Sequence, residues 1–490
     1  MRDVYGATIE RIKKQKGSES RLAMEALMWI SHAERPLSAN ELRNALAIDL
    51  GSTDFDADNM PSVAVVVGCC QGLIAVDREA STVRLIHPTL QHYLSAHLDI
   101  YRRPHSAMAE ICLTYLNSEQ VRAISAGSSP NIRDTPFLKY CSAYWGVHAK
   151  KELSARAKSL ALELLRGYDG HISARLLLEQ EDYLDRDDPC PSFQFSGLHC
   201  ASFFGIVDVV AALTQMECYD INERDFLGYT PLVWAARNGH GEVVSALLGQ
   251  EAANPEKPDN CGRTPFLHAA QYGHEGVVKI LLGRGEIDPD KPDNYAQTPF
   301  SYAAWGGHEG VVKTLLDQAG VHPDKPNNYG KTPLSYAAWD GREEVVKILL
   351  GRDEVNPDRP DRYSVTPLSY AAWRGHKGVV KMLLGRKEVN PDKPDNRGQT
   401  PLSYASQHGH EGVVEILLWR EEVNPNKPDN GGRTPLSYAA QYGREGVAGI
   451  LLNREDVAPD KPDNGGQTPV MFAAKHGHDK VVALLQPYEQ

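Results

Sequence analysis

The chain has 490 residues, of which 41% are hydrophobic and 24% are charged, and its formal net charge is −12. It contains no run of about 20 apolar residues that could span a membrane, and residues 1–16 lack the apolar core of a signal peptide. An acidic chain also disfavours nucleic acid, because phosphate contacts need clustered Lys and Arg. We therefore expect no membrane contact, no nucleic-acid partner and no secretion.

The cysteines are scattered along the chain and never occur as C-x-x-C, which is typical of reduced thiols. This pattern disfavours both a disulfide framework and a zinc site. It predicts a cytoplasmic protein, with the nucleus as an alternative, that binds no metal and no other cofactor. The eight positions are Cys69, Cys70, Cys112, Cys141, Cys190, Cys200, Cys218 and Cys261.

Residues 1–104 are predicted to form a winged-helix-like domain, because three helical stretches precede a β-hairpin. Ser38 and Glu41 have the spacing of a capping box at the start of the second helix. The third helix has no Lys or Arg with which to contact DNA, and its valines indicate burial, so a winged-helix transcription regulator is the least favoured function. The expected helices cover residues 21–33, 38–48 and 60–71, and the expected strands cover 73–77 and 82–86 around a turn at 78–81.

Residues 105–190 follow as a predicted helical connector, and residues 191–490 as a repeat array. Thr-Pro dipeptides recur every 34 residues in the array, and a degenerate unit precedes them at Ser196, which makes about nine units. A period of this length indicates a solenoid whose units bury their apolar faces against their neighbours. The predicted fold class is therefore mainly α. The dipeptides start at Thr230, Thr264, Thr298, Thr332, Thr366, Thr400, Thr434 and Thr468.

One unit shows how the repeat is expected to fold into a helix-turn-helix. Thr332 can cap a helix whose first residue is Pro333, and Gly341 can end that helix in the left-handed conformation. A second helix over 343–350 has an apolar stripe at i, i+4 spacing. The Pro-rich connection 355–361 predicts an extended, exposed finger. Its P-x-R-P spacing, P-x-K-P in other units, allows a polyproline ligand as a minor alternative.

The motifs T-P-L-x-x-A-A, G-H, V-V-x-x-L-L, V-N and D-N-x-G resemble the ankyrin repeat family over about three fifths of the chain. The period is 34 residues, whereas the family's is usually about 33. Ala296 and Ser364 stand where the family has glycine, so we expect strained or rearranged turns there. The resemblance implies that partners bind the concave face, which is formed by the first helices and the finger tips.

Three consecutive units carry tryptophan seven residues after Thr, at Trp305, Trp339 and Trp373. A serine lies one turn earlier in each unit, which argues for a half-exposed position. The same units carry a finger tyrosine three residues before Thr, at Tyr295, Tyr329 and Tyr363. Because exposed aromatic residues dominate binding hot spots, we predict a protein-binding site on these two ladders. The predicted polar rim consists of Tyr272, Asp340, Arg374, His408 and Tyr442.

Duplication offers an alternative explanation, in which one packing tryptophan was copied and stacks along the solenoid. Another aromatic ladder, four residues after Thr, is interpreted as inter-repeat packing only (Tyr302, Tyr336, Tyr370, Tyr404 and Tyr438). The histidines that follow the helix-ending glycines would be about 10 Å apart in such a stack, too far to share an ion. We interpret them as helix-start residues, replaced twice by arginine, at Arg342 and Arg444.

Two further segments resemble a larger class of protein. Gly72-Leu73-Ile74 and Leu85-Ile86-His87-Pro88-Thr89 are similar to the winged-helix segment that follows the NACHT ATPase in fungal NLR-like (STAND) proteins that end in ankyrin repeats. Pro136–Tyr140 and Tyr144–His148 are similar to their helical connector. No G-x-x-x-x-G-K-[ST] phosphate loop occurs. The resemblance thus implies the sensor half of such a receptor, whether a separate product, a subunit or part of a longer reading frame.

No motif of nucleophilic or metal-assisted catalysis occurs in the sequence. Cys141 and His148, which lie close together along the chain, are interpreted as packing residues of the connector. We therefore predict a protein that is not an enzyme and that binds other proteins as a scaffold or ligand sensor. NLR-like signalling is its expected context, and a generic adaptor subunit is the alternative.

Overall fold

The computed structural model describes residues 2–77, 79–97, 100–124, 135–184 and 194–488. They form two compact units, Met1–Asp259 and Asn260–Gln490. The predicted domain boundary at 190/191, Cys190 and Arg78 lie outside the described residues, and the seven other cysteines are free thiols. In the described part of the chain, no helix is both long and apolar enough to cross a membrane.

The N-terminal part of the first unit is the predicted winged-helix domain. Its elements are α1 (Arg2–Lys13), α2 (Glu19–His32), β1 (Leu37–Ser38), α3 (Ala39–Leu46), η1 (Ala57–Asn59), α4 (Val63–Cys69), β2 (Ile74–Asp77), β3 (Thr82–Leu85) and α5 (Pro88–Ala96). The predicted capping box is present, since Ser38 Oγ accepts from Glu41 N at 3.2 Å and Glu41 Oε2 accepts from Ser38 N at 2.7 Å. The strands pair antiparallel in the order β1-β3-β2, with Ile74 opposite Leu85.

Two features of this domain differ from the expectation. Helix α1 is present although the sequence did not predict it, and its Ile9 and Ile12 are buried. Charged residues on the other face of this helix obscure its apolar stripe in the sequence. Helix α4, expected to be buried, is half-exposed: Val65 is 49% exposed, and Val66 and Cys69 are its buried residues. A run of valines is apolar on every side, so the sequence alone could not show that one face packs against α2.

The connector shares a core with the winged-helix domain. Its elements are α6 (Pro104–Asn117), α7 (Glu119–Arg122), α8 (Leu138–Lys151), α9 (Ala155–Leu165), η2 (Tyr168–Gly170) and α10 (Ile172–Gln180). Trp29 of α2 is fully buried and lies edge-on to Tyr140, with ring centroids 5.8 Å apart. Trp145 contacts Phe204 of the first repeat at 5.3 Å, and a Cβ at Gly146 would lie 2.2 Å from the Phe204 ring. Aromatic packing around α8 therefore joins the three regions of this unit.

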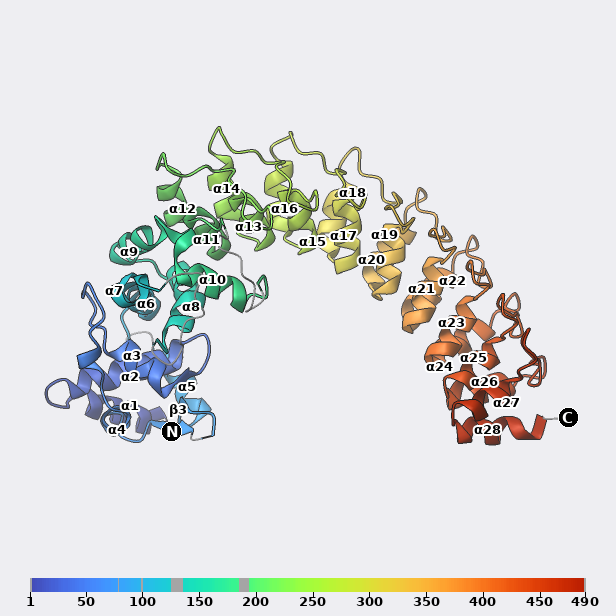
Figure 1. Cartoon of the computed structure of the whole chain (residues 1–490), viewed down its shortest axis with the longest axis horizontal. Helices are drawn as coiled ribbons and strands as arrows, with labels where there is room; N and C mark the ends of the chain where they lie inside the picture. The colour runs from blue at the N-terminus through green and yellow to red at the C-terminus, as the bar shows by residue number, and fades with distance from the viewer. Residues whose placement is uncertain (1, 78, 98–99, 125–134, 185–193, 489–490) are drawn as a thin grey trace. The chain divides into compact units, whose positions relative to one another are not determined.

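Each repeat is a pair of short helices. Within each of the two compact units, successive pairs follow one another in chain order (Figure 1). The first unit holds α11 (Gly197–Phe204), α12 (Val207–Leu213), α13 (Pro231–Arg237) and α14 (Gly241–Leu248). The second unit holds α15 (Pro265–Gln271), α16 (Glu275–Leu282), α17 (Pro299–Gly306), α18 (Glu309–Leu316), α19 (Pro333–Trp339), α20 (Glu343–Leu350), α21 (Pro367–Arg374), α22 (Lys377–Leu384), α23 (Pro401–His408), α24 (Glu411–Leu418), α25 (Pro435–Gln441), α26 (Glu445–Leu452), α27 (Pro469–Lys475), α28 (Asp479–Leu485) and η3 (Gln486–Tyr488). These nine pairs confirm the predicted array, including the degenerate unit.

The caps of the first helices form as predicted. Thr332 Oγ1 accepts a hydrogen bond from Ser335 N at 3.2 Å, and Pro333 is the first helical residue. Gly341 adopts a φ of +69°, which glycine tolerates without steric cost. The Ser335 hydroxyl lies 3.1 Å from the Thr332 hydroxyl, so this serine belongs to the cap.

The recurrent histidines bridge repeats and do not cap helices. His410 Nε2 donates to the Trp373 carbonyl of the preceding first helix at 2.8 Å, and it makes no capping hydrogen bond. Where arginine replaces histidine, Arg342 Nε donates to the Trp305 carbonyl at 3.1 Å. The predicted helix-start position is correct, since His410 directly precedes the first residue of α24. The side chain's partner in another repeat could not be predicted, because the sequence shows only the recurring position. The same bond occurs at His240, His308, His376, Arg444 and His478.

We expect His410→Ala to lower the free energy of unfolding by about 1 kcal/mol, because the Trp373 carbonyl loses a donor. His410→Arg should be close to neutral, since Arg342 and Arg444 donate the same bond. Thermal unfolding of the full chain measures both variants. An equal loss from the two substitutions would contradict the bridging role.

The fingers between repeats are tied to one another and are not fully extended and exposed as predicted. Asp361 is buried, and its Oδ1 accepts from the backbone N–H groups of Tyr363 and Val365 at 2.8 and 2.9 Å, which closes a turn. Arg362 N donates to the carbonyl of Tyr329 in the preceding finger at 3.0 Å. The sequence could not show this arrangement, because each bond needs the neighbouring finger in place.

The cations of the P-x-K-P pattern also connect neighbouring fingers. Lys325 Nζ lies 2.7 Å from Asp290 Oδ2, and Lys393 Nζ lies 2.8 Å from Asp358 Oδ2. Each lysine also donates to the backbone carbonyl of the same aspartate, at 3.3 and 2.9 Å. These contacts favour a structural role for the pattern over a polyproline ligand.

The two turns without glycine adopt the strained conformation that was predicted. Ala296 has a φ of +59° and Ser364 a φ of +63°, a region in which a Cβ costs about 1–2 kcal/mol. Ser364 Oγ offsets part of this cost by donating to Asn396 Oδ1 at 2.6 Å. Ala296 has no polar side-chain atom, so it cannot offset the cost of its positive φ with a side-chain hydrogen bond.

Ala296→Gly should therefore raise the free energy of unfolding by about 0.5–1 kcal/mol, after allowing for the greater freedom of glycine in the unfolded chain. Ser364→Gly should gain less, because it gives up a hydrogen bond. Gly330→Ala is the matched control from the intervening repeat: its φ is +79° and a Cβ would lie 2.9 Å from Arg362 N, so it should destabilise. Denaturant unfolding of the full chain tests the series, and a loss of stability in Ala296→Gly would refute the strain.

Candidate functional site

The three tryptophans lie at or near the C-terminal ends of the first helices α17, α19 and α21. Trp305 is 40% exposed, and Trp339 and Trp373 are half-buried. The position is thus half-exposed as predicted, but the reason given for it is wrong. The serine one turn earlier is itself buried in each repeat and hydrogen-bonds the capping threonine (Ser301, Ser335 and Ser369).

Each indole also contacts an aromatic ring of the next repeat. Trp305 lies over Tyr336, with ring centroids 5.1 Å apart and planes at 27°, and Trp373 lies over Tyr404 at 5.0 Å and 14°. Trp339 contacts both Tyr370 and Trp373 edge-on, at 5.4 and 5.2 Å. Stacking along the solenoid thus occupies part of each indole, and the remainder faces solvent. We refer to these rings as the aromatic row: Trp305, Tyr336, Trp339, Tyr370, Trp373 and Tyr404.

Two cations lie over the aromatic row. Lys331 Nζ is 4.8 Å from the Tyr370 ring centroid, and Arg374 Cζ is 5.2 Å from that of Trp339. Burial lowers the pKa of Lys331, although the charge of Asp361 acts in the opposite direction. The middle of the row therefore combines aromatic rings with two cations.

Sequence reasoning singles out Arg374 but misses Lys331, which directly precedes Thr332. A signal was available, because the residue before Thr differs between units and is sometimes basic. Its occupants are Tyr229, Arg263, Gln297, Lys331, Val365, Gln399, Arg433 and Gln467.

The finger tyrosines Tyr295, Tyr329 and Tyr363 form a separate ladder and are 51%, 47% and 60% exposed. Their carbonyls accept the hydrogen bonds that join neighbouring fingers, so their backbone is fixed. Within the residues that the structure describes, no ring contact joins them to the tryptophans. The structure therefore brings Trp339 and Trp373 into contact and joins Trp305 to the row through Tyr336, but it does not bring the tryptophans together with the finger tyrosines.

The predicted rim is mixed in character. His408 stacks on Trp373 at 5.6 Å, and its pKa is lowered by burial and then by neighbouring positive groups. Asp340 Oδ2 pairs with Arg342 Nη2 at 3.5 Å, and Arg374 belongs to the cations over the row. The remaining rim residues are exposed aromatics, Tyr272 at 38% and Tyr442 at 42%.

The tyrosines four residues after Thr pack between repeats, as predicted. Tyr370 and Tyr404 are 4% and 5% exposed, and their hydroxyls donate to Asp361 Oδ2 and Asp395 Oδ2 at 2.6 and 2.7 Å. Burial, together with these carboxylates, raises the pKa of both hydroxyls. This ladder supports the indoles and offers little surface of its own.

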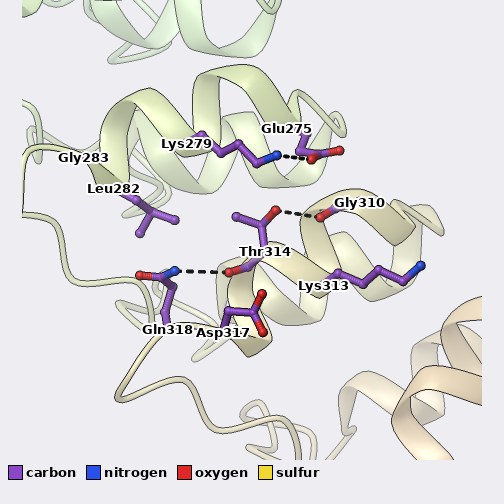
Figure 2. Close-up of a pocket in the computed structure, with 9 residues that line it drawn as sticks. All are labelled: Glu275, Lys279, Leu282, Gly283, Gly310, Lys313, Thr314, Asp317 and Gln318. Atoms are coloured by element: carbon purple, nitrogen blue, oxygen red, sulfur yellow. Dashed lines mark hydrogen bonds and ion pairs between the residues drawn. The ribbon is translucent and has the colours of Figure 1, made fainter.

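A surface cavity of about 600 Å³ lies elsewhere, between the second helices α16 and α18 (Figure 2). Lys279 points to Glu275 in an i, i+4 ion pair, and Thr314 Oγ1 donates to the Gly310 carbonyl at 2.9 Å. Gly310 leaves room for Glu275, because a Cβ there would lie 2.0 Å from Glu275 Oε2. These polar groups are paired within their own helices, and the cavity contains none of the predicted site residues, so we assign it no ligand.

Paired helices in 34-residue register that follow a winged-helix domain define a helical repeat protein. The chain belongs to the ankyrin repeat family, since the family model described as ankyrin repeats matches overlapping segments that together span residues 167–490. The family model of the GPI inositol-deacylase winged helix domain matches residues 10–103. This type of winged-helix domain is associated with NACHT proteins. No curated protein matches the chain. Both predicted resemblances, the ankyrin repeats and the winged-helix domain, are confirmed.

Proposed function

We propose that the chain is a non-catalytic scaffold in which the aromatic row docks a partner protein. Ankyrin repeats in general support protein interaction. The observation that carries the finer proposal is that the three indoles are held by rings of the next repeat and yet remain partly exposed. Rings that are already fixed lose little entropy on binding, which is one reason why tryptophans dominate hot spots.

The charges over the row favour a partner of particular chemistry. Lys331 and Arg374 lie on the faces of Tyr370 and Trp339. A partner segment that carries carboxylates among apolar side chains would pair with both cations while it covers the indoles. The net charge of the chain is −12, so recognition of an acidic partner would depend on this local charge and not on the overall field.

The domain order supports a biological context. A NACHT-associated winged-helix domain before an ankyrin array favours a ligand sensor in NLR-like signalling, in the cytoplasm or nucleus, with the repeat face as the sensing element. A generic adaptor subunit is the alternative. An ATPase coding region upstream in the same transcript would favour the sensor.

Affinity capture from host-cell extract tests the docking surface. The baits are the full chain, a Trp305, Trp339, Trp373 triple alanine variant and the control Trp419→Ala, all checked by circular dichroism. Trp419 is 86% exposed at the end of a second helix, α24, so the control also loses an indole. We expect partners to be lost from the triple variant and retained by the control.

The reverse pattern, or an unchanged partner list, would overturn the proposal. If the triple variant fails to fold, Arg374→Glu tests the same surface while leaving every ring in place. Arg374 is exposed, so this variant should fold, and it should lose the acidic partner. Full retention of partners by Arg374→Glu would then argue against the surface.

A further inference from the structure

A cluster of potential metal ligands lies in the first unit, where the winged-helix domain meets the connector. Glu34 follows α2, His105 is in the first turn of α6, and His148 is in the last turn of α8. One carboxylate oxygen and one nitrogen from each ring lie within 4.8 Å of one another. No sequence motif connects positions 34, 105 and 148, so only the fold brings these side chains together.

The distances within the cluster suit a shared ion. The Nδ1 atoms of His105 and His148 are 2.9 Å apart, and their rings are nearly parallel, at 24°. Glu34 Oε1 lies 3.8 Å from His148 Nδ1. Two ligands held at about 2.0–2.1 Å in a tetrahedral site would be about 3.3 Å apart. Each of these two distances would therefore change by about half an ångström, and Glu34 and His105, which lie within 4.8 Å of each other, would close around the ion.

We propose that Glu34, His105 and His148 bind one divalent transition-metal ion, with Zn²⁺ as the first candidate, and that the ion clamps the winged-helix domain to the connector. Two imidazoles and a carboxylate form a donor set that suits Zn²⁺, whereas Ca²⁺ and Mg²⁺ take oxygen ligands. Three protein ligands leave a fourth position for water. The site is independent of the aromatic row and of the function proposed for it.

The surroundings hold His148 in an orientation that suits coordination. His148 Nε2 lies 2.9 Å from the Tyr140 hydroxyl, which accepts a hydrogen bond from Glu34 N at 3.2 Å. With the proton on Nε2 and donated to Tyr140, Nδ1 keeps a lone pair for the metal, and an outer hydrogen bond of this kind is usual for ligating histidines. His148 is fully buried, and Trp29 lies edge-on to its ring at 6.5 Å.

One cation competes for the carboxylate. Lys151 Nζ lies 2.5 Å from Glu34 Oε1, and without metal it balances the charge of Glu34. The contact between His105 and His148 is then a hydrogen bond from one Nδ1–H to the other Nδ1. The Lys151 side chain is 45% exposed and can turn to solvent when an ion binds. Removing the Lys151 ammonium group should therefore strengthen metal binding. If the two histidines had only a structural role, no such gain in affinity would be expected.

Calorimetric titration of the full chain with Zn²⁺, and the absorption spectrum of its Co²⁺ form, test the proposal. The variants are Glu34→Gln, His105→Gln and Lys151→Met, and the control is His92→Gln at an exposed histidine of the same unit. We expect one ion per chain in the wild type and the control. Affinity should fall at least about tenfold in the Glu34 and His105 variants, and it should rise in Lys151→Met.

The Co²⁺ spectrum should show tetrahedral coordination without thiolate charge-transfer bands, which separates this site from binding to cysteines. Zn²⁺ should also raise the unfolding temperature of the wild type but not that of His105→Gln. Glu34 is exposed and His105 half-buried, so both variants are expected to fold. Equal affinity in His105→Gln and His92→Gln, thiolate bands, or an absence of binding would each overturn the proposal.

Discussion

Alanine in place of Trp339 is expected to weaken binding of the captured partner at least about 30-fold, which corresponds to about 2 kcal/mol. Trp339 is the middle indole of the three; it contacts Trp373 edge-on, and Arg374 lies over its ring. The substitution therefore removes the indole ring and also the aromatic face over which the Arg374 guanidinium lies. Calorimetry or interferometry with the purified partner measures the dissociation constant.

Two further substitutions show whether the effect belongs to the aromatic row. Tyr363 is 60% exposed in a finger, so Tyr363→Ala should weaken binding less, by about 3–10-fold. Trp419→Ala should change the dissociation constant less than about twofold, because the α24 end lies outside the row. A loss at Trp419 as large as that at Trp339 would place the binding site elsewhere.

His171 and His199 are expected to lower the free energy of unfolding of the first unit as the pH drops from about 6.5 to 4. Glu25 and Asp225, whose pKa burial raises to about 7 and about 6, contribute in the opposite direction. Burial lowers the pKa of His171 and of His199 to about 4, although hydrogen bonds to backbone carbonyls oppose this. Histidine in an unfolded chain has a pKa of about 6.5. Below that pH the unfolded chain binds protons that the folded chain does not, so stability is lost through this window, by about 3 kcal/mol per histidine.

Pulse proteolysis of the full chain in urea at pH 7 and pH 5 measures this loss, because fragments of the first unit can be followed separately. His199→Gln should lower stability at pH 7, since His199 Nε2 lies 3.1 Å from both the Glu223 and Tyr229 carbonyls. It should also shrink the difference between the two pH values. The same difference in His199→Gln and in the exposed control His92→Gln would contradict the assignment.

The repeat array could be predicted almost completely from the sequence, because the interactions that define each helix are local. Thr332 caps the helix that Pro333 starts, and Gly341 ends it with a positive φ, all within ten residues. The strain at Ala296 and Ser364 was predictable for the same reason, since only the residue and its own backbone are involved. Length, period and capping thus determined the fold class and the family.

Contacts between repeats and between domains could not be predicted in the same way. The partner of His410 is a carbonyl 37 residues earlier, and Lys331 reaches the ring of Tyr370 in the next repeat. The half-exposure of Trp339 was predicted from a serine that is in fact buried. These outcomes depend on how neighbouring units pack, which a periodic pattern does not encode.

The sequence by itself determined a winged-helix domain, a connector and nine ankyrin-type units, because caps, turns and apolar stripes act over a few residues. Only the tertiary structure decided which polar groups meet. It places two cations over the aromatic row and brings Glu34, His105 and His148 within 4.8 Å of one another. The physical reason is that such contacts are fixed by packing between distant segments, and no local propensity specifies them.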